Sequence, residues 1–201
     1  MFSIRKIITI SDYVTMANII FGLLAILLHD FRFIYLSIIF DALDGFVARK
    51  TNTVSDFGAE LDSICDVVSF GVAPAYLLYY NFESNFALIS ALIFALCGAL
   101  RLARFGILNV KHFVGLPIPA GSLVLASFCE VLDSGTLISI IAIVVGLLMI
   151  SDIGYPKYPH KVLIGIFFIS LVLAMWGFVY PVLLCGVGYV LYGIFKTIKA
   201  K

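Results

Sequence analysis

Residues 41–66, DALDGFVARKTNTVSDFGAELDSICD, carry half of the chain's 12 acidic side chains and are flanked on both sides by apolar segments. Asp41 and Asp44 are three residues apart, and Asp62 and Asp66 are four apart. Either spacing places two side chains on one face of an α-helix. We therefore expect two helices in this stretch, each presenting a pair of carboxylates.

The whole chain has the composition of a membrane protein. Of its 201 residues, 63% are hydrophobic and 12% are charged, and the mean hydropathy is +1.14. A soluble domain of average composition has about 25% charged residues, so we expect a bilayer around most of this chain. The net charge of +1 gives no reason to expect a nucleic-acid partner.

Clusters of charged residues, Pro, Gly and Asn divide the apolar sequence into segments. A membrane-spanning helix needs roughly 20 mostly apolar residues. The sequence therefore predicts an all-α, polytopic transmembrane bundle of about eight spans, with six spans as the alternative. The predicted spans are residues 12–29, 33–50, 57–80, 85–107, 117–132, 136–151, 162–177 and 179–196. We interpret residues 1–201 as a single domain and residues 1–11 as a segment at the membrane interface.

The basic residues predict the orientation of these spans. With the N-terminus inside, every Lys and Arg except Arg32 falls on the inner side of the predicted membrane. Lys and Arg are enriched in the cytoplasmic loops of membrane proteins. We therefore expect cytoplasmic N- and C-termini, and a cytoplasmic position for the two aspartate pairs.

A hairpin of residues 33–50 and 57–80 would bring the four aspartates together near the inner surface. Adjacent carboxylates repel one another, and ionised groups are costly inside a bilayer. Divalent cations would remove this repulsion, and carboxylate ligands favour Mg²⁺ or Mn²⁺. Two such ions could hold a diphosphate and stabilise a departing phosphate. The alternatives are pairing with Arg49 and Lys50, or the ion path of a small transporter.

Small residues accompany the acids on both predicted helices. Gly45, Ala48 and Gly58 would leave room for a bulky ligand close to the backbone. For each glycine alone, simple helix packing is an equally good explanation. Their alignment with the acidic pairs favours a binding site.

Together these residues form a known signature. The pattern Asp41-x2-Asp44-Gly45-x2-Ala48-Arg49-x8-Gly58-x3-Asp62-x3-Asp66 resembles, without a gap or substitution, that of the CDP-alcohol phosphatidyltransferases. The resemblance implies a six-helix core with two further spans, and a homodimer. It implies that two Mg²⁺ or Mn²⁺ ions lie among Asp41, Asp44, Asp62 and Asp66. It places the CDP moiety near Gly45, Ala48, Arg49 and Gly58. It also makes Asp66 the general base that deprotonates the acceptor hydroxyl.

Other segments resemble the phosphatidylserine synthase branch of that family. They are NIIFGLLAI at 18–26, SFGVAPA at 69–75, RLARF at 101–105 and GLPIPAG at 115–121. This likeness favours transfer of a phosphatidyl or archaetidyl group from CDP-diacylglycerol or CDP-archaeol to L-serine, with release of CMP. The same chemistry with glycerol 3-phosphate or inositol phosphate as acceptor is the first alternative. A non-enzymatic ion transporter is the second.

Three polar residues outside the signature are further candidates for the site. Arg101 and Arg104 lie one helical turn apart near the predicted inner surface. Such a pair is suited to the serine carboxylate, to the lipid diphosphate, to an acceptor phosphate or to anionic lipid headgroups. Asn18 could reach the nucleotide from the first span, or form a hydrogen bond with a neighbouring helix.

Overall fold

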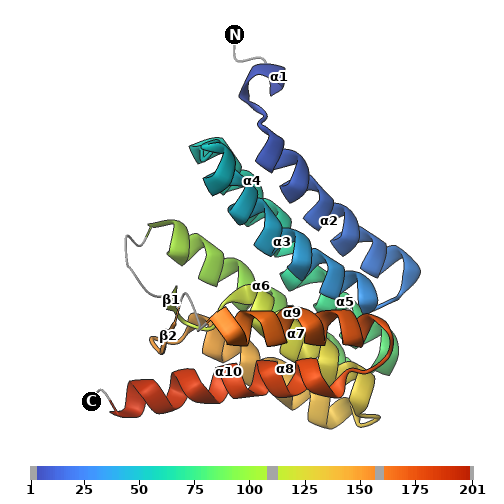
Figure 1. The fold of residues 1–201 in the computed structure, drawn as a ribbon. Helices are drawn as coiled ribbons and strands as arrows, with labels where there is room; N and C mark the ends of the chain where they lie inside the picture. The colour runs from blue at the N-terminus through green and yellow to red at the C-terminus, as the bar shows by residue number, and fades with distance from the viewer. Residues whose placement is uncertain (1–3, 108–112, 157–160, 200–201) are drawn as a thin grey trace.

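The computed structural model of the protein describes residues 4–107, 113–156 and 161–199, which are almost entirely helical (Figure 1). The helices are α1 (Ile4–Ile7), α2 (Ile10–Leu28), α3 (Arg32–Thr51), α4 (Asp56–Asp66), the π-helix η1 (Val67–Val72), α5 (Ala73–Phe82), α6 (Asn85–Ile107), α7 (Ile118–Val131), α8 (Gly135–Ile150), α9 (Lys161–Met175) and α10 (Tyr180–Lys199). Two short strands, β1 (Phe113–Val114) and β2 (Gly154–Tyr155), pair antiparallel. The prediction of a helical bundle is confirmed, and each predicted span coincides with a helix or, for 57–80, with α4, η1 and α5 in succession.

The lengths of the helices support a membrane protein but do not confirm the number of eight spans. Among the described residues, four helices are long and apolar enough to cross a membrane: α2, the continuous helix Asp56–Phe82, α6 and α10. The apolar helices α7, α8 and α9 are shorter. α3 is long enough, but it carries the first aspartate pair and has charged residues at both ends.

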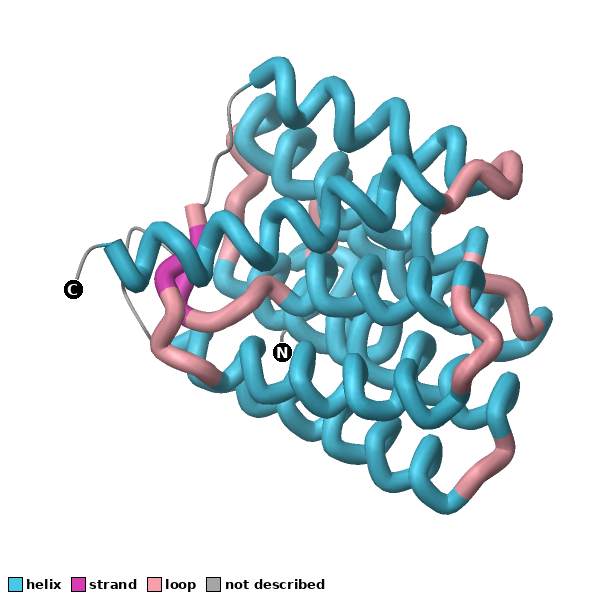
Figure 2. The backbone as a smooth tube through the Cα atoms, turned by 90° about the horizontal axis from the view of Figure 1, so that it is seen from below, coloured by secondary structure: helices cyan, strands magenta, loops and turns pink. Residues whose placement is uncertain are grey.

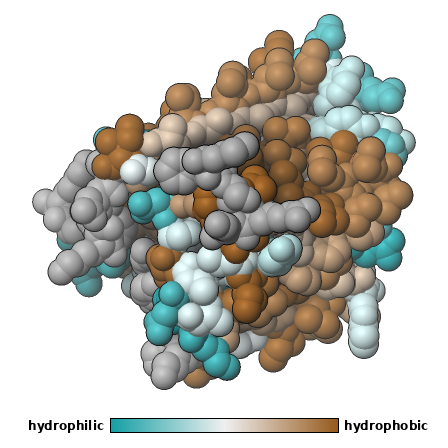
Figure 3. All heavy atoms as spheres, turned by 90° about the horizontal axis from the view of Figure 1, so that it is seen from above, coloured by the Kyte–Doolittle hydropathy of each residue, from teal (hydrophilic) through white to brown (hydrophobic). Residues whose placement is uncertain are grey.

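The loops gather at two ends of the bundle. Figures 1 and 2 show the β1–β2 ribbon at one end, and the turn between α3 and α4 lies toward the same side in Figure 1. The α2–α3 and α9–α10 connections lie at the opposite end. Figure 3 shows mostly hydrophobic residues over the visible surface between patches of hydrophilic ones. Exposed side chains such as Leu27 and Leu184 therefore face outward, where lipid would contact them.

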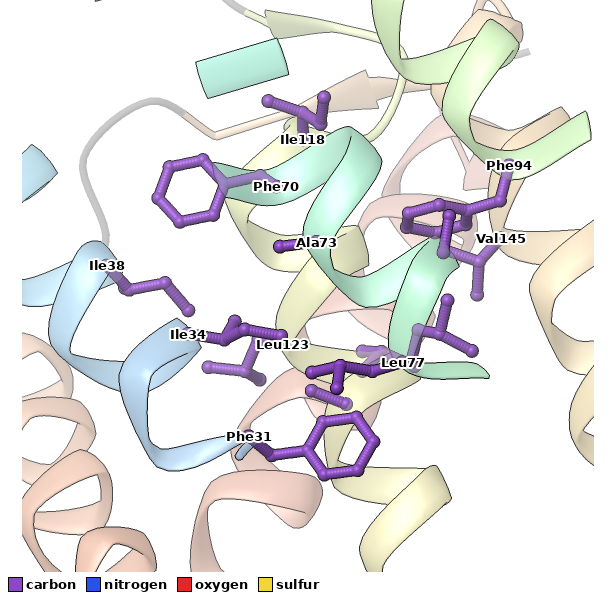
Figure 4. Packing of buried hydrophobic residues seen from close by; sticks show 14 of the residues in the cluster. Phe31, Ile34, Ile38, Phe70, Ala73, Leu77, Phe94, Ile118, Leu123 and Val145 are labelled. Atoms are coloured by element: carbon purple, nitrogen blue, oxygen red, sulfur yellow. The ribbon is translucent and has the colours of Figure 1, made fainter. Parts of the chain in front are cut away.

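The core lies between the central helices. Figure 4 shows Ile34 of α3, Leu77 of α5 and Leu123 of α7 packed together, and all three are buried. Phe94 of α6 and Val145 of α8 extend this cluster. This packing fixes α3 against the Asp56–Phe82 helix, and these two helices carry the aspartates.

The helix that follows the second aspartate pair is irregular. α4 ends at Asp66, and η1 follows directly. π-helical turns are rare and often occur at functional sites. Within η1, the buried Ser69 donates a hydrogen bond from its hydroxyl to the carbonyl oxygen of Asn18 (3.0 Å), which ties η1 to α2.

The close approach of α2 and η1 at Gly22 predicts a stability effect. A Cβ at Gly22 would lie 2.3 Å from Ser69 Oγ and 2.7 Å from Ser69 Cα. Because overpacking must move one helix, we expect Gly22→Ala to lower the free energy of unfolding by about 1–3 kcal/mol. The measurement is the Tm of the detergent-purified protein. Gly188→Ala on α10 is the matched control because a Cβ there meets nothing within 4 Å. Equal Tm values for the two variants would contradict the prediction.

Candidate active site

Three of the four predicted metal ligands converge in the structure. Carboxylate oxygens of Asp41, Asp62 and Asp66 all lie within 4.8 Å of one another. Asp41 projects from α3, and the other two project from α4. Within the described parts of the chain this is the only cluster of three or more His, Cys, Asp or Glu side chains of this kind. The predicted hairpin therefore brings its two helices together at their carboxylates.

Asp44, the fourth predicted ligand, lies outside that close group. Its Oδ2 accepts a hydrogen bond from Thr15 Oγ1 (2.7 Å), so α2 holds this side chain. Asp44 and Asp62 both line the cavity described below. The structure thus places Asp44 at the edge of the cluster.

The chemistry of the cluster fits a hard divalent cation. Asp62 Oδ1 is buried and has no hydrogen-bond partner. In the described part of the chain, the only ion pairs are Arg32 with Asp30 and Arg104 with Asp152. Pairing with Arg49 and Lys50, the structural alternative for the acids, is therefore not seen among these residues. Desolvated carboxylate oxygens that form no ion pair are the donor set that Mg²⁺ and Mn²⁺ take.

A cavity of about 340 Å³ opens beside the aspartates. Its lining contains all four signature residues predicted to contact CDP: Gly45, Ala48, Arg49 and Gly58. A Cβ at Gly58 would lie 2.9 Å from Asp12 Oδ1, so a larger side chain there would narrow the cavity. Asp44 and Asp62 share this lining, so the cavity brings the signature's small residues together with two of its four aspartates.

The sequence analysis missed polar residues that α2 adds to this cavity. Ser11, Asp12 and Thr15 line it, and all three side chains are buried. Asp12 Oδ2 accepts a hydrogen bond from the backbone N–H of Thr9 (2.7 Å), which completes a capping box at the start of α2. The signal in the sequence is the Thr-x-x-Asp spacing before an apolar run. That pattern indicates a helix start but does not by itself indicate a binding site.

Asn18 contacts the aspartate cluster and is not part of the cavity lining. Its Nδ2 donates a hydrogen bond to Asp66 Oδ1 (3.2 Å), while its own Oδ1 is buried without a partner. The hydroxyl of Ser37 donates a hydrogen bond to the backbone carbonyl oxygen of Asn18 (3.1 Å). Asn18 is thus held in place and orients the Asp66 carboxylate. The predicted contact with the nucleotide stays a prediction.

Arg101 is a buried cation beside the cluster. It is 4% exposed, and its Nε has no hydrogen-bond partner. The guanidinium carbon lies 5.1 Å from the ring centre of Phe105 and 5.5 Å from that of Phe113. Its charge also acts on Asp41 and Asp66. A desolvated guanidinium that forms no ion pair within the described residues is suited to an anionic ligand.

Arg104 is engaged with the backbone. Its Nη2 donates hydrogen bonds to the carbonyl oxygens of Val114 (3.0 Å) and Ser151 (2.8 Å), and its Nη1 lies 3.3 Å from Asp152 Oδ1. These bonds tie β1 to the end of α8. The geometry therefore favours Arg101 as the ligand contact, and a substrate role for Arg104 stays a prediction.

Comparisons with known proteins give consistent results. Residues 6–190 match the family model described as CDP-alcohol phosphatidyltransferase. The chain is 72% identical over 199 residues to the CDP-diacylglycerol–serine O-phosphatidyltransferase of Methanocaldococcus jannaschii, covering 99% of each chain. It is 41% identical over 169 residues to the archaetidylserine synthase of Methanothermobacter thermautotrophicus, covering 77% of this chain and 72% of the relative. It is 40% identical over 162 residues to the CDP-diacylglycerol–serine O-phosphatidyltransferase of Bacillus subtilis, covering 72% of this chain and 88% of the relative.

Proposed function

The chain belongs to the CDP-alcohol phosphatidyltransferase family, and we propose that it transfers a phosphatidyl-type group from a CDP-activated lipid to the hydroxyl of L-serine, releasing CMP. The observation that carries this proposal is a cavity whose lining combines the signature's small residues with two of its carboxylates, Asp44 and Asp62. The names of the three relatives support serine as the acceptor. Those names include both diacylglycerol and archaetidyl lipids, so we propose CDP-diacylglycerol or CDP-archaeol as the donor.

The protein is an integral membrane protein, and we propose that residues 1–201 form one domain with eight spans. In this arrangement residues 1–11 lie at the membrane interface, and both termini and the active site face the cytoplasm. The support is the distribution of charge: basic residues in the last turns of α3 and α10 lie toward the β1–β2 end of the bundle, and Arg32 lies at the other end. The family resemblance also leads us to propose a homodimer.

We assign Asp41, Asp62 and Asp66, with Asp44 at their edge, as ligands of two Mg²⁺ or Mn²⁺ ions. The support is the set of converging carboxylates and the unpartnered Asp62 oxygen. When bound, such ions would neutralise the lipid diphosphate and stabilise the charge that develops on CMP.

Asp66 is the proposed general base. Its carboxylate takes the proton of the serine hydroxyl while the serine oxygen forms a bond to the lipid-bearing phosphorus. The bond from that phosphorus to the CMP oxygen breaks, and CMP leaves with the electron pair. No covalent enzyme intermediate is needed. The hydrogen bond from Asn18 holds the carboxylate in a fixed orientation, which keeps the base positioned for this transfer.

Arg101 is the proposed partner of the serine carboxylate. A carboxylate has one negative charge and suits the Arg101 guanidinium, which forms no ion pair within the described residues. A phosphorylated polyol carries nearly twice that charge and would require a larger basic pocket. Because Arg104 is bound to the backbone, the surroundings of Arg101 favour serine over glycerol 3-phosphate or inositol phosphate.

The proposal is tested by the release of CMP from the purified protein. We expect turnover with a CDP-lipid, Mn²⁺ or Mg²⁺ and L-serine, and none above background with glycerol 3-phosphate or inositol phosphate. Offering CDP-diacylglycerol and CDP-archaeol in parallel identifies the lipid. Turnover with a phosphorylated polyol alone would overturn the choice of acceptor. Ion flux without any dependence on CDP-lipid would favour the transporter alternative.

A further inference from the structure

Helix α10 forms hydrogen bonds with the chain at both ends of the short strand β2. The hydroxyl of Thr197 accepts a hydrogen bond from the backbone N–H of Gly154 (3.1 Å). The hydroxyl of Tyr189 donates one to the carbonyl oxygen of Pro156 (3.0 Å). These two contacts are more than two helical turns apart on α10. They fix the strand along the helix rather than at one point.

Between these hydrogen bonds, the side chain of Tyr155 lies in a recess of α10. A Cβ at Gly193 would lie 2.2 Å from Tyr155 Cε1, so the ring rests directly on the helix backbone. Tyr155 is 1% exposed, and its ring centre lies 5.5 Å from that of Tyr189. β2 is thus anchored to α10 by its backbone and by its side chain.

The strand pairing carries this anchorage to Arg101. In the antiparallel register of β1 and β2, Phe113 lies opposite Tyr155. The Phe113 ring is one of the two that contact the Arg101 guanidinium, and it lies 5.6 Å from the other, Phe105. Arg101 forms no ion pair within the described residues, and both rings contact its guanidinium at cation–π distance. The position of the ribbon therefore sets the position of the guanidinium.

We infer that α10 is a positioning element for the acceptor site: it clamps the β1–β2 ribbon, holds Phe113 on Arg101, and so presents the guanidinium to the carboxylate of the incoming amino acid. This inference rests on the proposed role of Arg101. The nucleotide cavity is lined by α2, α3, α4 and the turn between α3 and α4, without α10. A disturbance of α10 should consequently affect the two substrates differently.

The test compares variants that remove one hydrogen bond each. Loss of one such bond is worth about 1 kcal/mol, so we expect Tyr189→Phe and Thr197→Val each to raise the KM for serine about 5-fold. The kcat and the KM for the CDP-lipid should change less than about 2-fold, the size of most neutral surface effects. Thr197→Ser keeps the acceptor hydroxyl and should restore the KM for serine. Tyr192→Phe, on the exposed side of the same helix, is the matched control.

A second readout does not depend on activity. Hydrogen exchange of the backbone amides of Gly154 and Gly115 reports the ribbon directly, because Gly154 donates to Thr197 and Gly115 donates to the carbonyl oxygen of Ile153 (2.9 Å). Both amides should exchange faster in Thr197→Val than in Thr197→Ser. Unchanged exchange would contradict the clamp.

Arg101→Gln separates the inference from the function on which it rests. If this variant leaves the KM for serine unchanged, the proposed role of Arg101 is wrong. If Arg101→Gln raises the KM for serine but the α10 variants do not, α10 is not a positioning element while the function stands. The same conclusion follows if the α10 variants raise the KM values for both substrates equally, since this would indicate a general loss of stability.

Discussion

Asp66→Asn should reduce kcat by about 10²–10⁴-fold, the usual contribution of a general base, while CMP binding in the presence of Mn²⁺ falls far less. Asn has the same shape as Asp but cannot accept the serine proton. Asp41 and Asp62 remain within 4.8 Å of the substituted side chain, so two carboxylates of the close group are retained. The measurements are CMP release at saturating serine and CMP affinity by calorimetry.

Glu60→Gln is the control for Asp66→Asn because it removes a carboxyl charge from the same helix at an exposed position. Its activity should stay within about 2-fold of the wild-type value, as for most surface substitutions. If Asp66→Asn retained a tenth of the wild-type kcat, the assignment of Asp66 as the base would be wrong. If CMP affinity fell as much as turnover, Asp66 would act as a metal ligand only.

The sequence predicted the positions of the helices because their apolar segments end at charged residues, glycine or proline. α6 (Asn85–Ile107) agrees with its predicted bounds at both ends. The π-helix Val67–Val72 could not be predicted, because six residues are too few to distinguish a π-helical period from an α-helical one. The β1–β2 ribbon was also missed. Its strands have two residues each, too few for a recognisable alternation, and β2 contacts α10, which is distant in the sequence.

The sequence predicted those site residues that share a helix face or belong to the signature. It did not predict the roles of residues that come together only through tertiary contacts. The spacing within residues 41–66 indicated the carboxylate cluster. Arg101 and Arg104 have the same chemistry one turn apart, and only tertiary structure distinguishes them. Arg104 meets the carbonyl oxygens at the end of α8, whereas Arg101 meets two aromatic rings. Asp12 was missed because a capping residue and a cavity residue have the same appearance in the sequence.

Asp41→Asn should abolish detectable turnover. It should also weaken Mn²⁺-dependent CMP binding by about 100-fold or more. Removing a residue that only supports a metal ligand already costs about 10–100-fold in metal affinity, and Asp41 is proposed to be a ligand itself. Asp41 is the sole member of the close group that α3 supplies. Its loss leaves only the α4 pair at the centre of the site. Because Asp44 lies outside the close group and is bonded to Thr15, Asp44→Asn should reduce CMP affinity less.

Asp41→Asn should have a higher Tm than the wild-type protein without metal and a lower Tm with metal. With EDTA, the wild-type protein retains neighbouring carboxylates that repel one another, so removing one charge should raise the Tm. With Mn²⁺, the wild-type protein should be stabilised by binding and the variant much less, because a ligand that binds the folded state more tightly stabilises it more. The order of the two Tm values should therefore reverse between EDTA and Mn²⁺. An unchanged order, with the variant less stable in both conditions, would indicate that Asp41 is a structural residue rather than a metal ligand.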